Sequence, residues 1–179
     1  MALFGDRASK KPRGEKPSTT FAKVSCQLFG NLLAALERAV PDAKPDYTVV
    51  LRYAVAIIAL NYHSRHIKRP DVATVIDEAN RNAARSMAHT LDNEARIDDR
   101  VAFYDRYMAI SPGSLADEVE SLVLDLVTGE DDATHSLVRR YAEDALGTPL
   151  TMTDEAFTEF GEVVEERIII SSKLVMKSL

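Results

Sequence analysis

The sequence has few of the residues that crosslink a chain or form the turns of a strand-rich fold. Its 179 residues include one cysteine, no tryptophan, seven glycines and seven prolines. A single cysteine, Cys26, excludes an intramolecular disulfide, and such a sequence is typical of proteins in a reducing compartment. Strand-dense folds use more turn residues than this, so the composition favours helices. A chain of this length can bury a core without a disulfide or a metal.

Long apolar runs are also missing. The longest, 49–62, is interrupted by Arg52 and Asn61 and falls short of the roughly 20 apolar residues of a bilayer span. The first residues lack the apolar stretch of a secretory signal, and residue 2 is alanine rather than the glycine of a myristoylation motif. We therefore expect a cytoplasmic protein with no membrane insertion.

Short motifs with a defined mechanism are absent as well. The sequence contains no glycine-rich phosphate loop, no nucleophile elbow, no His-Glu-x-x-His pair and no paired Cys-x-x-Cys. It therefore indicates no catalytic residue, and we expect no cofactor. Whether the protein is an enzyme stays open, although a non-catalytic role fits the sequence better.

Charge is distributed unevenly along the chain. Residues 1–17 carry a net charge of +3, 18–113 carry +1, 114–166 carry -13 and 167–179 carry +3, which gives -6 overall. The first of these regions is rich in Lys, Arg, Gly and Pro, and it has too few apolar side chains to offset the entropy of ordering. We therefore expect it to be a disordered basic tail. The acidic region would repel nucleic acid and attract a basic partner protein.

Apolar residues recur at helical spacing through most of the chain. Proline and glycine breaks separate segments predicted as helices at about 18–39, 46–67, 70–91, 93–110, 115–127, 132–146 and 153–175. The predicted fold is all-α. It is an irregular bundle of six to seven helices in a single domain, 18–179, preceded by the disordered tail 1–17. Ser18 or Thr19 is expected to cap the first helix, and Thr153 the last.

Two segments have distinctive apolar patterns. Residues 46–67 are apolar around nearly the whole helix circumference, which predicts a central position in the bundle. The weak point is the run 168–170, because three consecutive isoleucines are also typical of a strand. A lone strand would have no partner here, so we predict helix.

Possible metal ligands and nucleophiles have simpler interpretations. His63 and His66 share a helix face, but their neighbours are cationic and oppose metal binding. We interpret the segment as a solvated basic helix end, formed by His63, Arg65, His66, Lys68 and Arg69. Asp132 and His135 have the same spacing, but Asp132 is better explained as a helix cap. Cys26 is interpreted as a small buried side chain, and we expect no metal site.

The leading hypothesis is a helical protein-interaction or regulatory module of unknown partner. Its expected contact surface is acidic and lies within 114–166, with Glu118, Asp125, Glu159, Glu162 and Glu166 as candidates. The glutamates near the C-terminus recur, together with Glu155, at helical spacing between apolar positions, as on a solvated helix face. Self-association is also expected, because the apolar surfaces of 46–67 and of the last helix exceed what a small domain readily covers.

Two alternatives remain open. The first is a small-molecule-binding protein or enzyme with a pocket between helices, where Tyr53, Tyr62, Tyr104 and Tyr107 supply polar contacts and His63 and His89 titrate. The second is weak nucleic-acid binding through the tail and the basic helix end. A nucleic-acid domain normally presents a basic folded face, so we do not expect nucleic acid as the main partner.

Overall fold

The computed structural model describes residues 15–110 and 133–178, and the regular structure within them is entirely helical. The helices are α1 (Pro17–Ala39), α2 (Tyr47–His66), α3 (Val72–Asn93), α4 (Arg100–Ile110), α6 (Ala133–Leu146) and α7 (Asp154–Ser178). The all-α prediction is confirmed. The helix expected at 115–127 and most of the tail expected at 1–17 lie outside the described residues.

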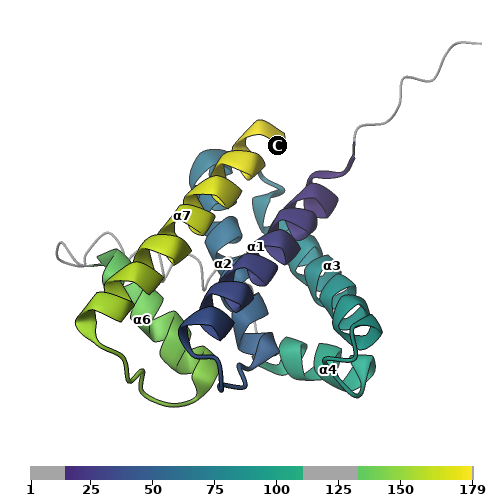
Figure 1. Cartoon of the computed structure of the whole chain (residues 1–179). Coiled ribbons are helices and arrows are strands. Elements are labelled where there is room, and N and C mark those ends of the chain that lie inside the picture. Colours follow the sequence, from purple (N-terminus) through teal and green to yellow (C-terminus); the bar gives the residue numbers. More distant parts are fainter. Residues whose placement is uncertain (1–14, 111–132, 179) are drawn as a thin grey trace, which may run out of the picture.

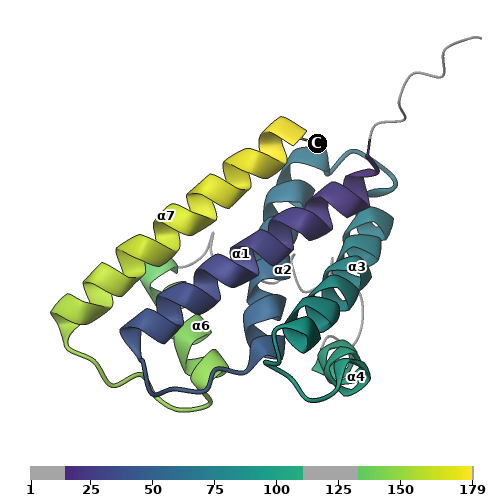
Figure 2. The ribbon, with the colours of Figure 1, turned by 45° about the vertical axis from the view of Figure 1, so that its right-hand side comes forward.

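The helices pack around α1 and α2. Figures 1 and 2 show α1 lying between α7 and α3, with α2 crossing behind it. Contacts run from α2 to each of the other helices of the described chain, as its all-round apolar sequence predicts. Most of its apolar side chains are buried, whereas Val49, Ile57 and Leu60 are partly buried.

Two helix starts follow their capping residues. The Asp46 carboxylate accepts a hydrogen bond from the backbone N–H of Thr48 at 2.9 Å, so α2 begins at the next residue, Tyr47. The Thr153 hydroxyl accepts one from the N–H of Ala156 at 3.2 Å, which confirms its predicted role at the start of α7. Each side chain satisfies a backbone donor that the helix leaves free.

The predicted cap of α1 is wrong. The helix begins at Pro17, and Ser18, which is only 2% exposed, lies inside its first turn. The residue at the cap position is Lys16, and its side chain makes no capping bond. Proline fixes the helical φ angle and has no N–H to satisfy, so it can open the helix without a hydroxyl at the cap.

The start of α4 differs from the prediction as well. A helix was expected from residue 93, but α4 begins at Arg100. The chain first turns through Ala95, whose φ of 54° is left-handed, and the N–H of Arg96 bonds to the carbonyl of Leu91 at 2.8 Å. Asp99 then accepts hydrogen bonds from the first free N–H groups of α4. The turn at Ala95 and the cap formed by Asp99 therefore separate α3 from α4, although the apolar pattern continues at helical spacing.

The isoleucine run 168–170 is helical and lies within α7, as predicted. The inner side of α7 carries Phe157, Phe160, Val164 and Val175, each at most 4% exposed, and the helix packs against α1, α2 and α6. Burial of this stripe outweighs the preference of consecutive β-branched residues for a strand.

Candidate functional site

The outer face of α7 is an exposed stripe of carboxylates. Glu155, Glu159, Glu162 and Glu166 follow one another at spacings of four, three and four, and all four are exposed. They lie on the side of the helix opposite its buried stripe. Figure 2 shows α7 along one edge of the bundle, beside α1. We call these four residues the acidic stripe.

The acidic stripe has no counter-charge within the described part of the chain. None of its four carboxylates forms an ion pair or hydrogen bond with residues 15–110 or 133–178, whereas Glu37 binds Arg96 at 2.9 Å and Asp46 pairs with Arg106. Like charges one helical turn apart destabilise a helix by about 0.2–0.5 kcal/mol per pair. The stripe therefore costs α7 roughly 1 kcal/mol, which a cationic partner would offset.

The same helix face changes character towards the C-terminus. Ile169 is 51% exposed and Ile170 39% exposed, and Lys173, one turn further on, is also exposed. Two other large apolar side chains are exposed in the described chain, Ile67 and Val101. They belong to other elements, and neither has an exposed large apolar neighbour in the sequence. The outer face of α7 thus runs from acidic through apolar to basic.

The predicted acidic residues divide into two groups. Glu159, Glu162 and Glu166 lie side by side on the acidic stripe, as their spacing predicts. Glu118 and Asp125 lie outside the described residues. The sequence analysis did not identify three further surface residues on this face, Ile169, Ile170 and Lys173. They lie one and two turns after Glu166, so the helical repeat alone places them on the same face.

The basic helix end is a separate cluster, at the junction of α2 and α3. Arg65, Lys68 and Arg69 are exposed there. Arg69 forms a bidentate pair with Asp71 at 2.9–3.0 Å, and this hydrogen bonding lowers the pKa of the aspartate. The predicted His63 and His66 also lie here, and the ring of His66 rests 4.6 Å from that of Tyr62. Ion pairing therefore neutralises part of this cluster, and its weak nucleic-acid contact stays a prediction.

The other side chains that could bind a metal or act as a nucleophile do not form a site in the described residues. Across residues 15–110 and 133–178, no three His, Cys, Asp or Glu side chains converge as metal ligands would. Burial raises the pKa of the Cys26 thiol to about 11, so it carries almost no nucleophilic thiolate at neutral pH. In the same residues, no helix combines the length and apolar character needed to cross a bilayer.

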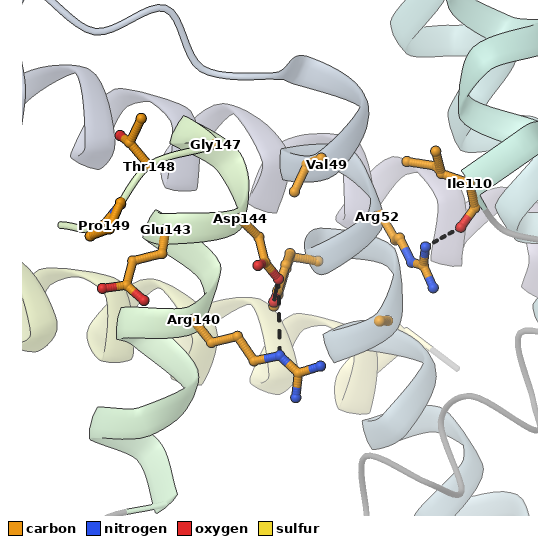
Figure 3. Close-up of a pocket in the computed structure, with 11 residues that line it drawn as sticks. Val49, Arg52, Ile110, Arg140, Glu143, Asp144, Gly147, Thr148 and Pro149 are labelled. Carbon is orange, nitrogen blue, oxygen red and sulfur yellow. Dashed lines mark hydrogen bonds and ion pairs between the residues drawn. The ribbon is translucent and has the colours of Figure 1, made fainter.

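A pocket of about 680 Å³ opens between α2, the end of α4 and α6. Figure 3 shows Arg52 and Val49 entering it from α2, Arg140 and Asp144 from α6, and Ile110 closing its far side. The hydroxyl of Tyr53 donates to Oδ2 of Asp144 at 2.5 Å, and Nε of Arg140 lies 4.0 Å from the same oxygen. The guanidinium of Arg52 donates to the backbone carbonyl of Ile110. The pocket therefore joins apolar walls to a charged network.

Of the four tyrosines predicted to serve a pocket, only Tyr53 lines this one. Tyr62 and Tyr107 are buried, and Tyr104 lies below the guanidinium of Arg85 at 5.8 Å. Burial, reinforced by the Asp144 carboxylate, raises the pKa of Tyr53. The phenol therefore stays a neutral hydrogen-bond donor at physiological pH.

No local pattern in the sequence indicates the other polar pocket residues. Tyr53 and Asp144 are 91 positions apart, so no local spacing links them. Comparison with protein-family models, curated proteins and solved structures found no match to this chain. Its function is therefore inferred from the outer face of α7 and from the pocket between α2 and α6.

Proposed function

We propose that this chain is a protein-interaction module that binds a basic partner protein through the acidic stripe of α7. The observation that carries the proposal is the row of four exposed carboxylates without a counter-charge in the described chain. A row of like charges weakens its own helix and strengthens attraction to a cationic surface. The partner's matching feature is a helix or extended segment with lysine or arginine along one side.

The rigid support of the stripe favours this role. α7 is held along its inner face by α1, α2 and α6, and the Arg139 guanidinium lies 4.3 Å from the ring centre of Phe157 near its start. The carboxylates are therefore presented on a helix whose backbone is already folded, so a partner does not have to order that backbone on binding. Electrostatic attraction of this kind accelerates encounter and weakens as salt rises.

The test uses a fluorescein-labelled amphipathic helical peptide with lysines along one face, titrated with the full chain and read by fluorescence anisotropy. Glu155→Lys/Glu159→Lys is expected to weaken binding about 10-fold, since each reversal replaces attraction by repulsion. The matched control, Asp98→Lys/Asp105→Lys, makes the same charge change at exposed carboxylates on and beside α4.

Binding by the control variant should stay within about 2-fold of the wild type, and raising salt from 50 to 300 mM should weaken both complexes. Equal losses in the two variants would mean that only net charge matters, which would refute the acidic stripe as the contact surface. Thermal unfolding of each variant checks that the fold is retained.

A second candidate function is small-molecule binding in the pocket. Its volume of about 680 Å³ lies within the usual range for ligand sites, about 300–1,000 Å³. Apolar walls with a few fixed polar groups are typical of such sites, and Tyr53, Arg140 and Asp144 supply that network.

Ligand-observed NMR with a library of small fragments tests this second function. Fragments that occupy the pocket should lose affinity in Arg140→Gln and keep it in Arg167→Gln, because Arg167 is exposed on α7 and does not line the pocket. If no fragment distinguishes the two variants, the pocket is not a ligand site.

A further inference from the structure

The C-terminal part of α7 has a charge pattern that is complementary to the same pattern running in the opposite direction. On the outer face, Glu166 lies three residues before Ile169, and Lys173 lies three residues after Ile170. The acidic Glu166 on one side of the pair is therefore mirrored by the basic Lys173 on the other.

This pattern is what an antiparallel pair of identical helices requires. In a two-fold symmetric contact each residue meets its counterpart reciprocally, so one patch must complement itself. With the axis between Ile169 and Ile170, these two isoleucines face each other across the interface. Glu166 of each chain then faces Lys173 of the other.

We propose that a second copy of this chain binds the C-terminal half of the α7 outer face, with the two α7 helices antiparallel. The exposed isoleucines, 51% and 39% accessible, form the apolar centre, and the Glu166–Lys173 pairs flank it on both sides. This inference goes beyond the proposed function, because it assigns a different partner to the neighbouring part of the same helix face.

The geometry of α7 permits the contact. The helix packs against α1, α2 and α6 on its inner side, and Figure 2 draws no other described helix beyond its outer side. With the axis at the isoleucine pair, the two helices overlap from residue 161 to residue 178, about five turns or roughly 27 Å. Glu155 and Glu159 lie outside this overlap, so they remain open to a basic partner in the dimer.

The contact is small. A single helix pair of this length buries less than the roughly 1,200 Å² of a stable interface, so a dissociation constant on the order of 100 μM is expected. Sedimentation equilibrium of the full chain from about 10 μM to 1 mM should show the mass rising from 19.8 kDa towards twice that value. Higher salt should weaken the dimer because ion pairs flank its centre.

Charge reversal tests the pairing directly. Glu166→Lys and Lys173→Glu should each weaken the dimer at least 5-fold, since symmetry applies each change twice. The doubly reversed variant should dimerise like the wild type. An equimolar mixture of the two single variants should also form a heterodimer, because every facing pair is then opposite in charge.

Three results would overturn the inference. These are a wild-type chain that stays monomeric at 1 mM, single reversals without effect on association, and a double reversal that fails to restore it. Glu155→Lys is the matched control, because it makes the same charge change on the same face outside the overlap. If that control dimerises normally but Glu155→Lys/Glu159→Lys still binds the lysine peptide as the wild type does, the proposed function fails and the dimer stands.

Discussion

Two buried tyrosines lead to opposite expectations for the same substitution. Tyr62 is 1% exposed, and its hydroxyl has no hydrogen-bond partner among residues 15–110 and 133–178. Tyr141 is 2% exposed, and its hydroxyl donates to the carbonyl of Leu32 at 2.9 Å. Each ring packs edge-on against another aromatic ring, Tyr62 on Phe21 and Tyr141 on Tyr53. Phenylalanine keeps both rings and removes only the hydroxyl.

The magnitudes follow from what each hydroxyl does in the folded chain. Burying a polar group without a partner costs about 1–3 kcal/mol, so Tyr62→Phe should raise the free energy of unfolding by about 1 kcal/mol. A satisfied hydrogen bond contributes about 0.5–1.5 kcal/mol, so Tyr141→Phe should lower it by about 1 kcal/mol. The two variants should therefore differ by about 2 kcal/mol.

Urea unfolding followed by circular dichroism measures the difference. The midpoint should move in opposite directions for the two variants with an unchanged slope, and the melting temperatures should separate by roughly 4–8 °C for a chain of this size. If Tyr62→Phe lowers stability by 0.5 kcal/mol or more, its hydroxyl is hydrogen-bonded and the reasoning fails (0.5 kcal/mol is about the lower bound for a net hydrogen bond).

Four further expectations concern single sites. Ala95→Gly should stabilise the chain by about 0.5 kcal/mol in urea unfolding, because glycine relieves a left-handed φ of 54°. Burial alone would raise the pKa of Asp46, but hydrogen bonds from the first turn of α2 and from Arg106 lower it below its usual value. Its contribution of about 1 kcal/mol is therefore present above about pH 4 and lost as the pH falls further, so Asp46→Ala should destabilise at pH 7 and much less at pH 2. Since burial raises the pKa of Cys26 to about 11, its alkylation by iodoacetamide at pH 7.5 should be far slower in the folded chain than in urea. Glu162→Gln should raise the unfolding free energy by about 0.5 kcal/mol, as it removes repulsion within the acidic stripe.

Much of the fold could be predicted because its helices are amphipathic and sharply terminated. The isoleucine run 168–170 was ambiguous in isolation, but the apolar positions around it repeat at helical spacing, and this decided correctly for helix. Errors occurred at helix ends. Pro17 opens α1 without a hydroxyl cap, and Ala95 reverses the chain in a conformation that favours glycine. Such ends depend on single residues and not on a repeated pattern.

The candidate sites were predictable to very different degrees. The acidic stripe follows from helical spacing within one element, so Glu159, Glu162 and Glu166 could be grouped before the fold was known. The pocket could not be predicted in this way, because Tyr53 and Asp144 come from helices that only the tertiary packing brings together. The sequence left the isoleucine pair ambiguous between helix and strand, and its exposure follows only once the buried stripe on the opposite side of α7 is known.

On the outer face of α7, local preferences and the fold disagree. Elsewhere in the described chain, carboxylates such as Glu37 and Asp46 meet guanidinium groups. On α7, carboxylates follow one another without such partners, and two β-branched side chains extend into solvent from the same face. Both features weaken a helix, and both could be removed without disturbing the buried side. Departures of this kind are expected where a surface is kept for binding, because a partner that supplies cations and an apolar contact would satisfy both at once.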